Sequence, residues 1–274
     1  MLWNEYVFHK QTVRELSQRY RLDRRTIRKL FTSYQLSKKT HNPRPIHLLV
    51  DALYFGKRTN YSSWCAVLFR DAKSKENLWW AFDSHESTSL YLEGRRELEK
   101  LGYTIHSVTA DGLGCIRTAF LGLSYQMCQV HMERLILRGT TRNPKTEAGE
   151  VLLALSKSLH TTDRRTFQRR FLLYWQKYYL FLNEKTIHPD GSWSYAHENL
   201  RRAVYSIRTL LPFLFTFEKD SHIPKNTNSI EGFFSHVRDQ MRAHRGLSKK
   251  NQQRILHSIF LASTTAPEKK EKQP

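Results

Sequence analysis

Apolar positions recur at helical spacing through the first forty residues. They form two sets, Val13, Leu16 and Tyr20 on one face, and Ile27, Leu30 and Phe31 on the face of a following helix. Residues 21–23 form a short turn between them, and Asp23 can cap the second helix. That helix exposes four basic residues, Arg24, Arg25, Arg28 and Lys29. The pattern predicts a helix-turn-helix domain over residues 1–36 whose second helix enters the major groove of DNA; the alternative is a structural hairpin with a solvated basic face.

Residues 37–45 combine charge with two prolines and predict a linker. From Ile46 the pattern changes to short runs of β-branched and aromatic residues, which predict strands at 46–55, 64–69, 78–82, 104–110 and 125–130. Helices are predicted at 90–101 and from Met132. We expect an α/β fold with a mixed sheet in the RNase H-like order, first and fourth strands side by side, starting with residues 46–138.

The segment 139–222 predicts an all-helical insertion, with helices at 151–159, 167–182 and 199–215. Arg165 and Arg169 share a face at i, i+4, which suits contact with a DNA backbone; an ordinary solvated face is equally compatible. The loop 188–193 presents Trp193. This side chain either stacks on an unpaired base or packs in a core.

The last strong pattern is a helix that Glu231 opens, within residues 226–242. It belongs to the final part of the predicted catalytic core, residues 223–263. Its apolar stripe is Ile230, Phe233, Phe234, Val237 and Met241. Another face carries Glu231 and Ser235 with Arg238 and Arg242, a carboxylate beside phosphate-binding arginines. The alternative is an ordinary amphipathic surface helix. Residues 264–274 are too polar to pack and predict a disordered tail.

The charge of the chain narrows its partners. Lys+Arg 45 against Asp+Glu 25 gives a formal net charge of +20, which favours double-stranded DNA as the partner. Three cysteines do not make a disulfide framework. No signal peptide or membrane span is recognisable, so we expect a soluble, cytoplasmic protein associated with the nucleoid.

Three acidic residues stand where metal ligands are needed. Asp51 and Asp111 each follow an apolar run, and Glu231 opens a helix. Three converging carboxylates can hold two Mg²⁺ ions, with Mn²⁺ as a substitute, for phosphodiester hydrolysis. Asp51 would bridge the ions, Asp111 would bind one of them and Glu231 the other.

Cys128 and His131 have C-x-x-H spacing, which can provide half of a zinc site. Neither Cys65 nor Cys115 has a paired ligand nearby in the sequence to supply the other half. The favoured interpretation is that His131 contacts the scissile phosphate or orients a carboxylate, while Cys128 packs beside it.

Together these features resemble the bacterial insertion-sequence transposases of the Mutator-like DDE superfamily. The resemblance rests on Asp51, Asp111, the Cys128/His131 pair, the helical insertion and Glu231, and on the pairing of WNEYVFHKQTVREL with NTNSIEGFFSHVR. It implies that the three carboxylates are the metal-binding triad, that the freed 3′-OH attacks target DNA in the same site, and that the chain works as a homodimer or higher oligomer on DNA.

Alternatives remain at this point. Relatives often carry a zinc ribbon before the helix-turn-helix, whereas Met1 here lies almost directly before that unit, which leaves a shortened copy possible. Another RNase H-like nuclease, such as a junction resolvase, would use similar carboxylates. A catalytically silent DNA-binding regulator derived from a transposase is the alternative from a different class.

Overall fold

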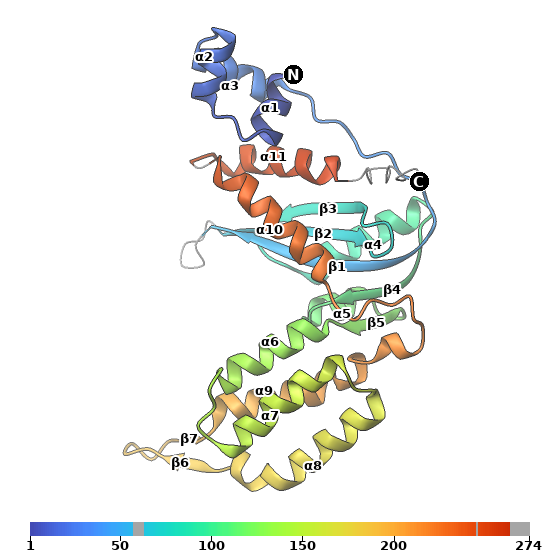
Figure 1. Cartoon of the computed structure of the whole chain (residues 1–274), viewed down its shortest axis with the longest axis vertical. Coiled ribbons are helices and arrows are strands. Elements are labelled where there is room, and N and C mark those ends of the chain that lie inside the picture. Colours follow the sequence, from blue (N-terminus) through green and yellow to red (C-terminus); the bar gives the residue numbers. More distant parts are fainter. Residues whose placement is uncertain (57–62, 245, 264–274) are drawn as a thin grey trace, which may run out of the picture. The chain divides into compact units, whose positions relative to one another are not determined.

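A computed structural model describes residues 1–56, 63–244 and 246–263 (Figure 1). Five strands form one sheet in the order β3-β2-β1-β4-β5. They are β1 Pro45–Phe55, β2 Trp64–Asp71, β3 Asn77–Asp83, β4 Thr104–Ala110 and β5 Ser124–Met127. β1, β2 and β3 are antiparallel, and β4 and β5 are parallel. The predicted α/β class, with a mixed sheet in the RNase H-like strand order, is confirmed.

The chain divides into two units, which are described separately. Unit 1 contains residues 1–104 and the residues from 228 onward, and unit 2 contains residues 105–227. The predicted disordered tail, residues 264–274, lies outside the described residues. Among the residues that the structure describes, no helix has the length and hydropathy needed to cross a membrane.

In unit 1, side chains of alternating strand residues enter two different cores, because successive side chains point to opposite faces of a sheet. Leu53 on β1 and Ala66 and Leu68 on β2 pack with α10 (Asn228–Arg242) and α11 (Lys249–Ala262). Phe69 and Trp79 point the other way, toward α4 (Thr88–Lys100). Helix α4 comes so close that a Cβ on Gly94 would lie 2.6 Å from the Trp79 ring.

The N-terminal helices are α1 (Leu2–Phe8), α2 (Val13–Tyr20) and α3 (Arg24–Ser33). The predicted cap of α3 is present, since the Asp23 carboxylate accepts a hydrogen bond from the Thr26 backbone N–H at 3.0 Å. Leu16, Ile27 and Phe31 are buried and belong to the core that also contains residues of α10 and α11. The expected apolar role of Leu30 is wrong: its side chain is 45% exposed, because the shared core covers only the Ile27/Phe31 side of α3.

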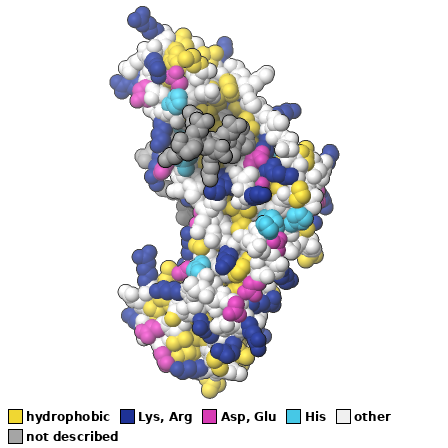
Figure 2. Space-filling view, turned by 45° about the vertical axis from the view of Figure 1, so that its right-hand side comes forward, with side chains coloured by type: hydrophobic (Ala, Val, Ile, Leu, Met, Phe, Trp, Pro, Cys, Tyr) yellow, Lys and Arg dark blue, Asp and Glu magenta, His cyan; other side chains and the backbone are white. Residues whose placement is uncertain are grey.

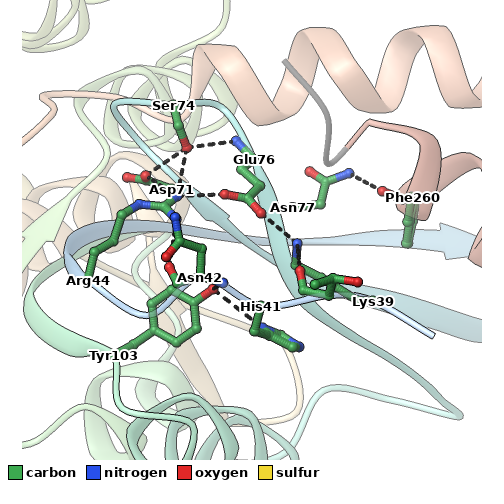
Figure 3. Close-up of polar contacts among 11 residues, drawn as sticks. Lys39, His41, Asn42, Arg44, Asp71, Ser74, Glu76, Asn77, Tyr103 and Phe260 are labelled. Atoms are coloured by element: carbon green, nitrogen blue, oxygen red, sulfur yellow. Dashed lines mark hydrogen bonds and ion pairs between the residues drawn. The ribbon is translucent and has the colours of Figure 1, made fainter. Parts of the chain in front are cut away.

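The residues before β1, where the sequence predicts a linker, are bonded to the sheet (Figure 3). Lys39 lies 2.6 Å from Glu76, and Arg44 lies 2.6 Å from Glu76 and 2.9 Å from Asp71. The backbone N–H of Asn42 donates to the Tyr103 hydroxyl at 3.3 Å. Burial alone would raise the pKa of Asp71, but hydrogen bonds from Ser74 and Arg44 lower it below its usual value. The carboxylate therefore stays ionised and paired.

Unit 2 contains β4 and β5, the short helix α5 (Gly114–Ala119) and a bundle of longer helices. The bundle consists of α6 (Gln129–Thr140), α7 (Glu147–Lys157), α8 (Arg164–Leu182) and α9 (Glu198–Leu210), followed by 3₁₀ turns at Leu211–Phe213 and Thr216–Glu218; a third 3₁₀ turn, Ser158–His160, follows α7. Helices α6 and α9 touch at Gly139, where a Cβ would lie 2.7 Å from the backbone oxygen of Asn199.

The expectation of an all-helical insertion needs a correction. Residues between α8 and α9 form a two-stranded antiparallel sheet, β6 (Lys185–Ile187) and β7 (Trp193–Tyr195). The β-forming residues of these strands flank an Asp190–Gly191 turn, in which Gly191 takes a positive φ of 81°. Figure 1 shows this hairpin projecting beyond the helices of unit 2.

Candidate active site

Asp51 lies on the face of β1 and β2 that α10 covers. In the β1–β2 register Asp51 is directly opposite Leu68, and Leu53 is opposite Ala66, so these side chains share one face. Leu53 and Leu68 pack in the core that contains Ile230 and Phe234 of α10. Asp51 itself is partly exposed, and its Oδ1 accepts a hydrogen bond from the Ala52 N–H at 2.8 Å.

Asp51 lies inside its strand, not at the strand end where the apolar run that precedes it stops. β1 runs from Pro45 to Phe55, close to the strand predicted at 46–55. The antiparallel partner β2 pairs with every residue from Leu48 to Phe55, which holds the chain extended past the carboxylate. The residues before and after Asp51 are therefore both held in the β1–β2 pairing, which fixes the position of Asp51.

Helix α10 has the predicted amphipathic arrangement. Ile230, Phe234 and Val237 are buried, and Phe233 and Met241 pack against the same core. Glu231 is in the first turn and partly exposed, a position where a negative charge suits the helix N-terminus.

The other polar residues that the sequence predicts on this face of α10 point to solvent. Ser235, Arg238 and Arg242 are exposed, and Arg242 pairs with Asp239 at 2.9 Å. The Glu231 face of α10 is thus accessible to a ligand along its length.

In unit 2, Asp111 and Cys128 stand at the same edge of the sheet. β4 and β5 are parallel, with Ala110 opposite Met127, so Asp111 and Cys128 each follow the carboxyl end of their strand. The Cys128 N–H donates to the Ala110 carbonyl at 2.7 Å, which extends the pairing to this edge. Carboxyl ends of parallel strands are a common location for functional side chains in α/β folds.

Local contacts hold the partly exposed Asp111 in place. The Leu113 N–H donates to Asp111 Oδ1 at 2.9 Å, and the Tyr125 hydroxyl donates to the Asp111 backbone carbonyl. The next residue, Gly112, packs against Leu210, since a Cβ there would lie 2.7 Å from Leu210 Cδ1. A larger residue after Asp111 would displace the carboxylate or the helix end that carries Leu210.

Cys128 and His131 meet Thr227, the last residue of unit 2. The Thr227 hydroxyl lies 3.3 Å from the Cys128 sulfur, to which it donates, and 3.4 Å from His131 Nδ1. Cys128 is fully buried, whereas His131 is partly exposed. Burial alone would raise the pKa of the Cys128 thiol, but hydrogen bonds from His131 and Thr227 lower it below its ordinary value.

Helix α6 starts at Gln129 rather than at the predicted Met132, because β5 ends at Met127 and Cys128 serves as the N-cap residue. His131 therefore belongs to the first turn of α6.

Thr227 is a site residue that sequence reasoning missed. It directly precedes α10, whose first turn carries Glu231. The available signal was its position before a predicted helix, where Thr commonly caps. Its contacts with Cys128, 99 residues away, were not visible in the sequence.

The basic residues predicted to bind DNA lie on several surfaces. Arg24, Arg25, Arg28 and Lys29 on α3 are exposed, as are Arg165 and Arg169 on α8. Figure 2 shows Lys and Arg side chains spread over the visible face rather than gathered in one patch. Trp193 lies on β7 and is 52% exposed, so it is not a core residue.

The donor atoms suit a hard divalent cation. Asp51, Asp111 and Glu231 offer carboxylate oxygens and all three are partly exposed. Oxygen donors of this kind are the ligands that Mg²⁺ and Mn²⁺ prefer. Each of these carboxylates therefore has the donor chemistry of a ligand to a hard divalent metal.

Comparisons with known proteins give no family assignment. No protein-family profile matches the chain, and no curated protein does. Among solved structures, the chain is similar to the Drosophila P element transposase strand transfer complex, with 10% identity, a TM-score of 0.44, and coverage of 95% of this chain and 91% of that chain. It is also similar to a chain of the simian T-cell lymphotropic virus intasome in complex with PP2A regulatory subunit B56 gamma, with 12% identity, a TM-score of 0.24, and coverage of 77% and 69%.

Proposed function

We propose that the protein is a DNA transposase that uses divalent metals to cleave and rejoin phosphodiester bonds. The observation that carries the proposal is the position of one carboxylate on a strand, one just after a strand and one in the first turn of a helix of this α/β fold. Asp51 is on β1, Asp111 follows β4, the neighbour of β1 in the strand order, and Glu231 is in the first turn of α10. The resemblance of the sequence to Mutator-like insertion-sequence transposases supports the same function.

In this proposal Asp51, Asp111 and Glu231 would hold two Mg²⁺ ions, which Mn²⁺ could replace. The chemistry that such ions would supply is activation of the attacking oxygen and stabilisation of the leaving one. The exposed Arg238 and Arg242 on α10 bind phosphates beside the scissile bond. No nucleotide cofactor is required, because strand transfer exchanges one phosphodiester bond for another.

The remaining basic surfaces hold the DNA. Arg24, Arg25, Arg28 and Lys29 read the element ends, whereas Arg165 and Arg169 contact backbone phosphates. Two ends must be joined to one target, so the chain acts as a homodimer or higher oligomer on double-stranded DNA. The proposed setting is the bacterial cytoplasm.

Strand cleavage by the purified chain tests the proposal. Asp51→Asn, Asp111→Asn and Glu231→Gln each remove a charged ligand and should abolish cleavage in Mg²⁺ while DNA affinity is retained. Glu93→Gln is the control, because Glu93 is an exposed acid on α4. Wild-type cleavage by any of the three carboxamide variants would refute the active-site assignment. Specific DNA binding by a wild-type chain that never cleaves would instead favour the silent regulator.

His131 is proposed to assist the reaction from the edge of the unit 2 sheet. Its ring is held by Thr227 and is partly exposed, which suits contact with a phosphate or an attacking water. His131→Ala should lower the cleavage rate by about 10²-fold in a folded, DNA-binding protein. Cys128→Ser should be milder. Stoichiometric zinc by mass spectrometry, lost in both variants together with the fold, would establish the structural-zinc alternative instead.

A further inference from the structure

Unit 2 carries an unbroken row of side chains in which three cations are separated by two pairs of aromatic rings. The row runs from α8 and α9 onto the β6–β7 hairpin, and we call it the cation–aromatic strip. Its members are Arg208, Trp175, Tyr205, Arg201, Tyr195, Trp193 and Lys185.

The helical half of the strip consists of side chains from α8 and α9. The Arg208 guanidinium lies 5.5 Å from the centre of the Trp175 ring, and Trp175 meets the Tyr205 ring edge-on at 5.4 Å. Arg201 lies 4.4 Å from the Tyr205 ring. These spacings are those of cation–π and T-shaped aromatic contacts.

The hairpin half continues from the same arginine. Arg201 lies 3.8 Å from the Tyr195 ring, which meets Trp193 edge-on at 5.3 Å. Lys185 lies 3.8 Å from the Trp193 ring. Arg201 also donates to Tyr205 on α9 and to Asn183, the C-cap residue of α8, so its guanidinium is held between these two helices.

The strip is open to solvent and positively charged. Trp193 is 52% exposed, Arg208 is exposed, and the Trp175, Tyr195 and Tyr205 rings are partly exposed. In the described part of unit 2, ion pairs engage the neighbouring Lys177 and Arg202. In the same part of the chain, aromatic rings rather than carboxylates contact the charged groups of Lys185, Arg201 and Arg208.

We propose that the cation–aromatic strip binds single-stranded DNA. Unpaired bases offer flat faces that stack on aromatic rings and guanidinium planes, and the intervening cations match the phosphates. Paired bases in a duplex are already stacked on each other and cannot use the rings. The inference rests on the proposed function, because strand cleavage and transfer leave unpaired DNA that must be held.

The test uses the full chain, without divalent metal, and two fluorescent probes, an oligo-dT of about 20 nucleotides and a duplex of the same length. Trp193→Ala should weaken oligo-dT binding about tenfold or more, which is the effect expected for losing one stacked base, and leave duplex binding unchanged. Trp193→Phe should retain most of the affinity. Circular dichroism of each variant checks the fold.

A matched pair of arginines separates the strip from general charge. Arg208→Gln and Arg202→Gln remove the same charge from exposed positions of α9, but only Arg208 contacts a strip ring. We expect Arg208→Gln to weaken oligo-dT binding clearly more than Arg202→Gln does.

Three results would overturn the inference. They are equal losses in the two arginine variants, unchanged oligo-dT binding by Trp193→Ala, and no oligo-dT binding by the wild type, in which case the strip fits a protein partner. None of these results bears on cleavage by Asp51, Asp111 and Glu231. Conversely, oligo-dT binding by a chain that never cleaves would leave the strip standing and remove the proposed transposase.

Discussion

His244 is a buried ionisable residue that links the stability of the N-terminal helices to pH. Its ring follows α10, is 4% exposed, and lies 4.4 Å from the ring of Tyr6 on α1. Burial lowers the pKa of His244 below the usual value of 6.5, since the protonated ring is poorly solvated there. The folded state therefore binds the proton more weakly than the unfolded state does.

The sign of the pH effect follows from this difference. Above about pH 6.5 the ring is neutral in both states, so His244 adds no pH dependence to the free energy of unfolding there. As pH falls below that value, the unfolded state takes up the proton first and the folded state loses stability. We expect His244→Phe to lose less stability than the wild type between about pH 6.5 and 5. The free energy of unfolding is measured by urea denaturation at each pH. Parallel pH profiles for the two proteins would contradict this prediction.

At the scale of elements, the contact between α6 and α9 depends on a glycine. A Cβ at Gly139 would lie 2.7 Å from both the Asn199 backbone oxygen and the Ala203 Cβ. Gly139→Ala should therefore force the helices apart and reduce the free energy of unfolding by about 1–3 kcal/mol. Gly232→Ala is the control, because α10 leaves open space at that position, and it should stabilise by about 0.5–1 kcal/mol. Thermal unfolding that shifts both variants in the same direction would count against this helix contact.

Helix α3 should carry preference for the element ends. Arg28 is exposed on α3, and a base-edge contact contributes about 1–3 kcal/mol of discrimination. Arg28→Ala should thus reduce the affinity ratio between end sequences and random duplex by roughly 5- to 150-fold. The control is Arg96→Ala, at an exposed position of α4, which should leave the affinity ratio unchanged. If a chain lacking residues 1–36 still selects the ends, α3 has another role.

The elements also show what the sequence could predict. The apolar residues of α10 recur at a clear helical period, because one face of this long helix packs on the core that contains β1. Its buried stripe and its Glu231 face could therefore be predicted from spacing alone. The β6 and β7 strands have three residues each, too few to display an alternating pattern. The extent of the strand that carries Asp51 followed from its composition, whereas the register that sets Asp51 opposite Leu68 is a tertiary contact. The contacts of Thr227 and the cation–aromatic strip likewise join residues that are distant in sequence.

At the scale of the whole molecule, a net charge of +20 should make DNA binding strongly dependent on salt. Each phosphate contact contributes about 0.9 to the slope of log affinity against log salt for duplex DNA. The double variant Arg165→Gln/Arg169→Gln should flatten that slope by about 2 if both side chains contact phosphates. An unchanged slope would place the DNA backbone elsewhere.

The central claim, that the carboxylates bind catalytic metal, is tested most directly by changing Asp111 to a softer ligand. A thiolate binds Mg²⁺ poorly but tolerates softer ions such as Mn²⁺. Asp111→Cys should therefore fail to cleave DNA in Mg²⁺ and regain cleavage in Mn²⁺, by about tenfold or more over Asp111→Asn in the same ion. Cleavage by Asp111→Cys in Mg²⁺ at the wild-type rate would contradict the account, as would equal inactivity of both variants in Mn²⁺ while the wild type cleaves.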